Sequence, residues 1–465
     1  MHSIMETIRL EDLRGKRVTI MGLGLNGGGV ASARFMAQQG ARVTVTDTKD
    51  EASLADSIAA LGDFDIRYVL GRHEMADFSD ADLVIKNPAV RPDNQYLAAA
   101  RAVETDLSIF LRLCPSRIAA VTGSKGKSTV STALAWILNS SGIKAFLGGN
   151  ITVSPLGFLD SAGPDDVIVL ELSSWQLGDL YGRKLLKPKV AVLTRIVPDH
   201  LDRYGTMDAY VADKRLIYAD QDRSDWTVYD RDDEYGLSFA KESRGQGLGY
   251  GLALPPRGYG IEVPADGSPC MARLPGGCLL ELVPGSLRVP GEHNRRNLAA
   301  AAIAAWALGA DASSIPRAAG TFAGLEHRLE PVKERNGVRW FNDSAATVPE
   351  AVSAAVGSFE SAVVLITGGT DKKLDFEAAR SAYRKAASVI LLSGTGTDKI
   401  RRILDADTIR YSGPYGDIVA AVAEADRLAH PGSVVVLSPG CTSFGMFKNE
   451  FDRGRCYKAA VAALL

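Results

Sequence analysis

The feature that most constrains the fold is AAVTGSKGKSTVSTALAW, residues 119–136, where an apolar run ends in a turn of Gly, Ser and Lys. The β-branched run predicts a buried strand, and the apolar pattern after the turn predicts a helix. Such a turn can aim several backbone N–H groups and a helix N-terminus at one anion. The stretch therefore predicts a strand–turn–helix unit of an α/β sheet, and phosphate binding is favoured over a plain turn with surface lysines.

The same turn supplies the other groups that a nucleotide phosphate needs. Lys127 would neutralise phosphate charge, and the Ser128 hydroxyl would face a magnesium ion. The loop is shorter than the usual one, because Val121 stands where the usual spacing places a glycine. The residues predicted to contact ATP phosphates here are Gly123, Ser124, Lys125, Gly126, Lys127, Ser128 and Thr129.

Strand and helix patterns alternate through most of the 465 residues, too many for one hydrophobic core. We expect an α/β protein with three domains in series, because such alternation favours parallel sheets covered by helices. The expected domains are residues 1–106, Rossmann-like; 107–324, of the P-loop ATPase type; and 325–465, again Rossmann-like. Short Gly- and Pro-rich segments at 225–290 predict a β-meander inserted in the central domain.

Composition excludes several classes of protein. A net charge of −2 leaves no basic excess for a nucleic-acid backbone. Five scattered cysteines without CxxC spacing favour reduced thiols over disulfides or a zinc site. The sequence shows neither a signal peptide nor a membrane span, so we expect a cytoplasmic protein without a membrane partner.

A second glycine cluster, GLGLNGGG at residues 22–29, follows the first predicted strand. Asp47 ends the next predicted strand, which imitates a dinucleotide fingerprint. The pattern alone is weak, and its plain alternative is a tight turn between strand and helix. A nucleotide-type phosphate ligand is favoured here, but no acid/base pair for hydride transfer is evident.

Motifs along the whole chain resemble those of the Mur ligase family. The matching segments are TGSKGKST, ELSSWQL, PDHLDRYGTMDAYVADKRLIY, PGEHNRRNLAAA, GLEHRLE, FNDSAAT, GGTDKKLDF and LSPGCTSFGMFKNEFDRG. The resemblance implies an enzyme that joins glutamate to UDP-N-acetylmuramoyl-L-alanine in peptidoglycan precursor synthesis, through an acyl phosphate made from ATP. It also implies a monomer that uses Mg²⁺.

The resemblance implies roles for residues around ATP. Asn297 is expected at the adenine, Arg328 at a phosphate, and Asp343 at the ribose or a metal. Two magnesium sites are implied, and Lys214 is expected to be carbamylated so that it becomes an anionic ligand. The implied catalytic residues are Lys127, Glu171, His200 and Lys214, and the implied metal ligands are Ser128, Glu171, His200 and Lys214.

The same resemblance implies two further sites. The first glycine turn would bind UDP rather than NAD, with Asn150 at the muramoyl group. Residues matching the uracil and diphosphate positions are Leu25, Asn26, Thr48 and Lys49, and those matching the glutamate site are Thr347, Lys372 and Ser443.

Several departures from the family pattern fall where the amino acid would bind. The D-glutamate enzymes usually read DSKATN, whereas this chain has Ala345 and Val348 in place of the lysine and the asparagine. Glu450 and Phe451 exchange the usual aromatic and acidic positions, and Arg195 replaces a common asparagine near the metal motif. Loss of a cation should weaken binding of a dicarboxylic amino acid. A variant of the family attaches L-glutamate to the same acceptor, and the departures make this chain resemble it. We expect L-glutamate to be the preferred substrate, with D-glutamate as the alternative.

Three other functions remain open. A folylpolyglutamate synthase relative would share the short loop but would leave the first domain without a purpose. A P-loop ATPase acting as a switch would hydrolyse ATP without an acceptor. A nicotinamide oxidoreductase would bind NAD(H).

Overall fold

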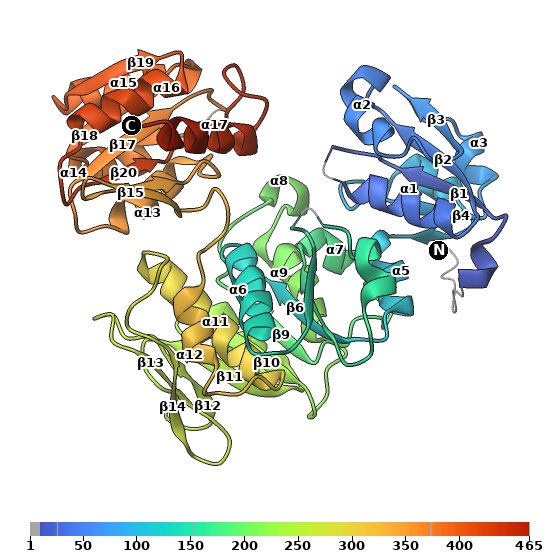
Figure 1. Cartoon of the computed structure of the whole chain (residues 1–465). Helices are drawn as coiled ribbons and strands as arrows, with labels where there is room; N and C mark the ends of the chain where they lie inside the picture. Colours follow the sequence, from blue (N-terminus) through green and yellow to red (C-terminus); the bar gives the residue numbers. More distant parts are fainter. Residues whose placement is uncertain (1–9, 26, 152, 373, 465) are drawn as a thin grey trace. The chain divides into compact units, whose positions relative to one another are not determined.

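The structure is a computed structural model that describes residues 10–25, 27–151, 153–372 and 374–464 (Figure 1). The strands of these residues form three sheets in chain order, of five, nine and six strands. This confirms three α/β regions in series, while the boundaries 1–106, 107–324 and 325–465 stay predictions. The chain divides into two compact units. The first contains two sheets and includes the chain up to Pro264, Cys270–Val283 and Asn297–Ala318; the second includes Ala265–Pro269, Pro284–Arg296 and the chain from Ala319 onward.

The first sheet is parallel and has the order β3-β2-β1-β4-β5. Its glycine turn joins β1 to α1, at the carboxyl edge where all five strands end. The strands are β1 (Arg17–Met21), β2 (Arg42–Asp47), β3 (Ile66–Leu70), β4 (Leu83–Lys86) and β5 (Val103–Glu104). The helices are η1 (Leu10–Leu13), α1 (Gly28–Gln38), α2 (Glu51–Ala59), α3 (Ala76–Ser79), α4 (Gln95–Ala99) and α5 (Asp106–Leu113).

The central sheet has the order β14-β13-β12-β11-β10-β9-β6-β8-β7. Its strands are β6 (Arg117–Thr122), β7 (Ala145–Gly149), β8 (Val167–Glu171), β9 (Val190–Leu193), β10 (Trp226–Asp230), β11 (Gln246–Gly251), β12 (Tyr259–Glu262), β13 (Cys270–Arg273) and β14 (Leu279–Val283). Helices in this part of the chain are α6 (Lys127–Ser140), η2 (Pro155–Ser161), α7 (Ser174–Gly178), α8 (Leu201–Tyr204), α9 (Met207–Arg215), η3 (Leu216–Tyr218), α10 (Glu234–Glu242), α11 (Glu292–Ala307) and α12 (Ile315–Thr321).

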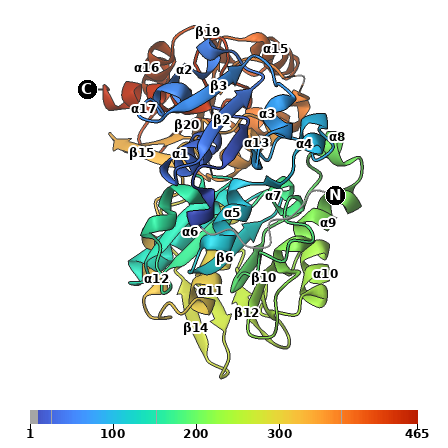
Figure 2. The ribbon, with the colours of Figure 1, turned by 90° about the vertical axis from the view of Figure 1, so that its right-hand side faces the viewer.

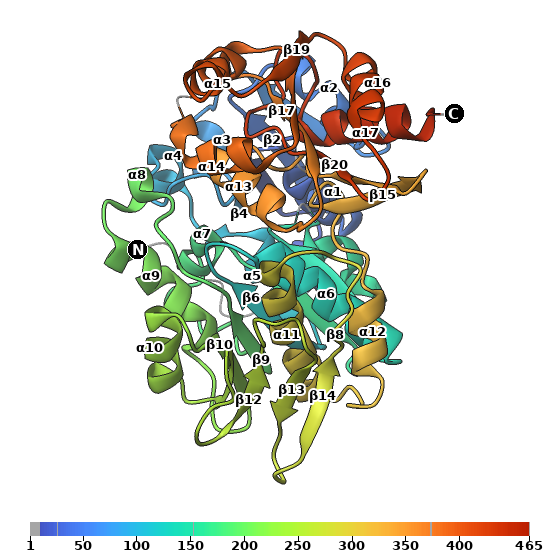
Figure 3. The ribbon, with the colours of Figure 1, turned by 90° about the vertical axis from the view of Figure 1, so that its left-hand side faces the viewer.

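The expected meander at 225–290 is wrong for its first half. Strands β10, β11 and β12 pair in parallel and continue the central sheet, because α10 provides a crossover from β10 to β11 and packs beside β10 (Figure 2). Only β12 to β14 pair antiparallel, and β13 and β14 project as a hairpin from the end of the sheet (Figure 3). The insertion is thus an extension of the central sheet rather than a separate layer.

The third sheet has the order β15-β16-β20-β17-β18-β19, with only the β15–β16 pair antiparallel. Its strands are β15 (Glu330–Arg335), β16 (Val338–Asn342), β17 (Val363–Gly368), β18 (Ser388–Leu392), β19 (Tyr411–Tyr415) and β20 (Val434–Leu437). The accompanying helices are α13 (Pro349–Gly357), η4 (Phe376–Ala379), α14 (Arg380–Lys385), α15 (Thr395–Ala406), α16 (Ile418–Leu428) and α17 (Glu450–Ala462).

Burial of the strands positions the loops that follow them. Every residue of β8, β9 and β20 is buried, as expected for parallel strands covered by helices on both faces. In the central sheet β6 lies between β9 and β8, so the loops after these three strands emerge together at the carboxyl edge. Ligands of open α/β sheets bind at this edge.

Candidate active site

The phosphate-loop candidate connects β6 to α6 as the sequence predicts, and two of its glycines cannot be replaced. Gly123 has φ 150°, and a Cβ there would lie 1.9 Å from the Thr194 hydroxyl oxygen. Gly126 has φ 92°, and a Cβ would lie 2.6 Å from Oδ1 of Asn297. No side chain caps the N-terminus of α6 at Gly126. The first turn of α6 therefore has no side-chain cap, and the structure brings Asn297 against Gly126.

Two lysine ammonium groups converge on this loop. Nζ of Lys127 lies 3.0 Å from the carbonyl oxygen of Gly123 and 3.1 Å from that of Ser124. Nζ of Lys214, on α9, lies 2.9 Å from the same Gly123 oxygen, although Lys214 is only 1% exposed. Burial, and then the charge of Lys127, lowers the pKa of Lys214 to about 7. The loop is therefore a site of concentrated positive charge.

The remaining loop residues have different surroundings. The backbone N–H groups of Ser124 and Lys125 donate to the Arg195 carbonyl oxygen, at 2.9 and 3.4 Å. The Ser124 hydroxyl also bonds the Tyr210 hydroxyl at 3.0 Å. These bonds anchor the loop to the segment after β9, so Arg195 contributes through its backbone. The Lys125 side chain is exposed, whereas Ser128 and Thr129 are half-buried in the first turn of α6.

Glu171 ends β8 and is 2% exposed. Its Oε1 accepts a hydrogen bond from Nδ2 of Asn150 at 3.1 Å, while its buried Oε2 has no hydrogen-bond partner among the described residues. A buried carboxylate oxygen without a donor is costly unless a cation or a ligand completes it. This unpaired oxygen fits a magnesium ligand, and the Asn150 contact links the candidate muramoyl site to it.

His200 lies in the loop after β9, beside two aromatic rings and Asp199, whose Oδ1 is 4.0 Å from Nε2 of His200. It has φ 53° at the start of α8, and its ring lies 5.1 Å from the Trp175 ring and 6.4 Å from that of Tyr210. Because Trp175 follows β8 and Tyr210 contacts Ser124, these contacts keep His200 near the ends of both strands. A role for His200 as a metal ligand stays a prediction.

The first sheet has a pocket of about 430 Å³ at its carboxyl edge. Asp47, 5% exposed, accepts hydrogen bonds from the Gly24 N–H at 3.0 Å and from the Lys49 N–H at 2.9 Å, so both its oxygens are occupied. Both oxygens thus help to shape the turn, and Asp47 also lines the pocket. Of the predicted UDP-site residues, Leu25, Thr48 and Lys49 line the pocket, and Asn26 lies outside the described residues.

Arg328 and Asp343 belong to the second unit. Asp343, at the end of β16, accepts hydrogen bonds from the Leu329 N–H at 3.2 Å and the Ser438 hydroxyl at 2.8 Å. Burial raises the pKa of Asp343 to about 7. Arg328 is exposed, in a turn whose neighbours His327 and Leu329 have φ 65° and 44°. The turn presents the guanidinium to solvent, as a phosphate contact requires.

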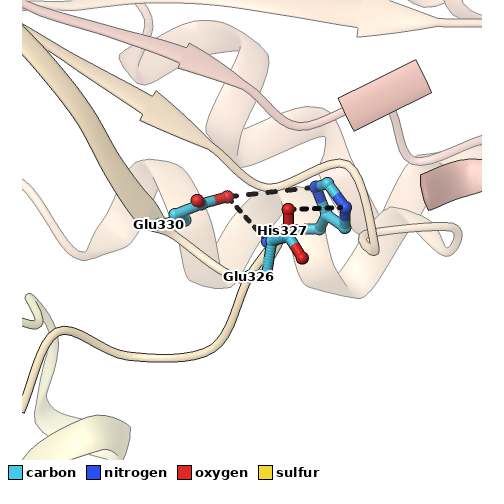
Figure 4. Close-up of side chains that lie close together, drawn as sticks. All are labelled: Glu326, His327 and Glu330. Carbon is cyan, nitrogen blue, oxygen red and sulfur yellow. Dashed lines mark hydrogen bonds and ion pairs between the residues drawn. The ribbon is translucent and has the colours of Figure 1, made fainter. Parts of the chain in front are cut away.

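A cluster of Glu326, His327 and Glu330 holds that turn (Figure 4). Although three metal-type ligands meet here, Nζ of Lys458 already lies 2.6 Å from Glu326 and 2.9 Å from Glu330. Nδ2 of Asn342 bonds Nδ1 of His327 at 2.8 Å. The lysine and the amide take the place of a metal, so the cluster acts as a brace for the turn. The sequence analysis missed it.

The three predicted glutamate-site residues differ in burial: Ser443 is buried, Thr347 half-buried and Lys372 exposed. The sequence analysis did not single out Arg453, which is 1% exposed on α17. Its guanidinium donates to the Ser344 hydroxyl at 3.0 Å, the Ser344 carbonyl at 2.8 Å and the Cys441 carbonyl at 3.1 Å. It thus ties together the segments that bear Thr347 and Ser443. An arginine at helical spacing gave no separate signal in the sequence.

Comparisons with known proteins agree with this layout. Three family models match the chain in order: "Mur ligase MurD-like, N-terminal domain" over residues 16–108, "Mur ligase middle domain" over 121–305, and "Mur ligase, glutamate ligase domain" over 327–441. Two relatives are UDP-N-acetylmuramoylalanine–D-glutamate ligases. That of Roseiflexus sp. (strain RS-1) is 41% identical over 97% of this chain and 99% of its own length. That of Treponema pallidum (strain Nichols) is 37% identical over 97% of this chain and 98% of its own.

The crystal structure of UDP-N-acetylmuramate–alanine ligase from Thermotoga maritima has a TM-score of 0.59. It is 20% identical and covers 96% of this chain and 99% of its own, which shows a shared fold. The identities to the two relatives extend over nearly the full length of the chain, so they show the class of reaction as well as the fold. The chain belongs to the Mur ligase family and is an ATP-dependent, amide-forming ligase.

Proposed function

We propose that this protein adds D-glutamate to the carboxylate of UDP-N-acetylmuramoyl-L-alanine, with ATP converted to ADP and phosphate. The observation that carries the proposal is the convergence of Lys127 and Lys214 on the Gly123 carbonyl, beside a strand that ends in Glu171. Transfer of a phosphoryl group to a carboxylate brings two anions together, and fixed positive charge lowers that barrier.

The chemistry runs in two steps. A carboxylate oxygen of the acceptor bonds to the γ-phosphorus of ATP as the bond to ADP breaks, giving an acyl phosphate. The glutamate amine then attacks the acyl carbon, loses a proton, and phosphate leaves as the amide forms. Lys127 would hold the γ-phosphate, Asn297 the adenine, Arg328 a phosphate and Asp343 the ribose or a metal.

Magnesium would shield phosphate charge and polarise the γ-phosphoryl group. Ser128 would hold one ion, and Glu171, His200 and Lys214 a second. The unpaired Oε2 of Glu171 supports this, whereas the ammonium of Lys214 would repel a metal. Carbamylation removes that repulsion: the amine nitrogen bonds the carbon of CO₂, one proton leaves, and an anionic carbamate remains. Wild type equilibrated with ¹³C-bicarbonate should give a carbamate NMR signal that is missing in Lys214→Arg.

The comparisons support D-glutamate better than L-glutamate, which the departures at Ala345 and Val348 led us to expect. Both relatives named above are D-glutamate enzymes. Thr347, Lys372 and Ser443 remain the proposed contacts of the amino acid. Arg453 donates to the carbonyl oxygens of Cys441 and Ser344, so it braces the segments that bear Ser443 and Thr347.

The deciding experiment measures phosphate release with ATP, Mg²⁺, UDP-N-acetylmuramoyl-L-alanine and each glutamate enantiomer in turn. D-Glutamate should support turnover with little release when either cosubstrate is omitted. Turnover with L-glutamate but not with D-glutamate would instead support the L-glutamate ligase expected from the sequence. Acceptor-independent hydrolysis would favour a P-loop switch instead.

We further propose that the protein is a cytoplasmic monomer. No described helix combines the length and apolar character of a bilayer span.

A further inference from the structure

His73 lines the pocket of the first sheet, yet none of the motifs discussed above includes it. Its imidazole packs edge-on against the rings of Phe78 and Tyr96, with centroids 5.8 and 5.1 Å away. The Tyr96 hydroxyl donates to the His73 carbonyl at 3.4 Å. Oγ1 of Thr46, which is fully buried, lies 2.6 Å from Nδ1. The ring is thus held on three sides in one orientation.

The hydrogen bonds of Thr46 define the tautomer of this ring. The Thr46 hydroxyl donates to the Arg72 carbonyl at 3.2 Å, and a hydroxyl has one hydrogen to give. We assign the arrangement that satisfies both contacts, in which Thr46 accepts from Nδ1–H of His73 and a lone pair remains on Nε2. Burial lowers the pKa of His73, although Asp47 opposes this, so the ring is neutral near pH 7.

Nε2 is open to a ligand. It has no hydrogen-bond partner among the described residues. It is also not among their buried side-chain atoms that lack a partner, so solvent or a ligand can reach it. Two backbone contacts anchor the segment of His73 beside the pocket. The Gly71 N–H donates to the Lys49 carbonyl at 2.8 Å, and Arg72 pairs with Asp47 in an isolated antiparallel β-bridge. One fixed acceptor therefore faces a pocket whose other walls include Thr48 and Lys49.

The pocket's two ends suit different parts of a nucleotide. The N-terminus of α1, after β1, has no side-chain cap and suits a diphosphate. His73 follows β3, two strands away in the order β3-β2-β1, or about 10 Å at the usual strand spacing. A nucleoside diphosphate with its phosphates at α1 would place its base near His73.

We propose that His73 determines the base specificity of this pocket by accepting the N3–H of uracil at Nε2. Uracil carries a hydrogen on N3, whereas cytosine presents a lone pair there, which would face the lone pair of Nε2. The inference rests on the proposed function, because it assumes that the acceptor is a uridine nucleotide. A purely structural role of His73 would require only that its ring pack against Phe78 and Tyr96.

The test is calorimetric titration of the full chain with UDP and with CDP. Wild type should prefer UDP by at least about tenfold, and His73→Leu should reduce this preference to about twofold or less. In His73→Gln the amide can rotate to offer either an acceptor or a donor, so UDP binding should persist while the preference falls. His430→Ala changes an exposed histidine of the third sheet's region and should match wild type.

The outcomes separate the two proposals. If wild type binds neither nucleotide, the UDP site and the role of His73 both fall. If wild type prefers UDP and a folded His73→Leu or His73→Gln keeps the full preference, only the inference about His73 is overturned. Thermal unfolding of each variant identifies any loss of fold, and His73→Gln decides if His73→Leu is unfolded.

Discussion

The glycine turn after β1 and the glycine turn after β6 both lead from a buried parallel strand into a helix, but they differ in charge. In the first, the Asp47 carboxylate fills the turn and bonds the Gly24 N–H. In the second, the ammonium groups of Lys127 and Lys214 both lie against the Gly123 carbonyl oxygen. Similar glycine patterns thus build one turn braced by a carboxylate and one turn approached by two ammonium groups. The charged neighbours, rather than the glycines, distinguish the two turns.

The largest effect should come from removing the cation of the second turn. Lys127→Ala should lower amide synthesis by about 10²- to 10³-fold, because charge developing on the phosphoryl oxygens loses a fixed partner. Lys125→Ala is the matched control, since its side chain is 68% exposed and its nearest carboxylate, Asp199, is 3.5 Å away. That variant should lose only a few-fold. Equal effects in the ADP-release assay would remove the distinction between the two lysines.

A second test compares a glycine from each turn. Gly123→Ala should destabilise the protein by about 3 kcal/mol, because its Cβ would overlap Thr194 at a φ that L-residues rarely adopt. Gly28→Ala meets no atom within 4 Å and should stay within about 0.5 kcal/mol of wild type. Urea unfolding measures both changes. A tolerated Gly123→Ala would show that the loop is not held as described.

The buried lysine gives a pH dependence. The pKa of Lys214 is about 7 in the fold against 10.5 for the free side chain, so the unfolded chain binds more protons between these values. The loss of folding stability caused by burying the charged ammonium is therefore complete below pH 7, and it vanishes as the pH rises to 10.5. Lys214→Met should therefore exceed wild type in unfolding free energy by up to about 4 kcal/mol at pH 7 and match it near pH 10.5. A constant difference across this range would contradict the shifted pKa; bicarbonate-free buffer keeps the amine unmodified.

The sequence predicted the strand–turn–helix units and the three α/β regions because buried parallel strands such as β8 and β20 are long apolar runs. It did not predict β15, whose residues are half-buried or exposed, or β19, which contains Gly413 and Pro414. Nor could it find Arg453 or His73, because their partners lie far away in sequence or belong to a fold not yet known. Asp47 shows the reverse: the fingerprint located the residue, but not the hydrogen bonds that its oxygens accept from the backbone.

The smallest effect should come from the acid that closes the first turn. Asp47→Asn replaces one carboxylate oxygen with an N–H donor, which would face the N–H of Gly24 or Lys49. One backbone donor then loses its acceptor at a cost of about 1 kcal/mol, and the pocket wall loosens. The KM for the UDP acceptor should rise by about fivefold while the KM for ATP stays unchanged, because the second turn has its own charges. NAD(H) should leave tryptophan fluorescence unaltered in both proteins. If the KM for ATP rose equally, the two turns would act as one site, and the contrast between a turn braced by a carboxylate and a turn lined by lysines would not describe this enzyme.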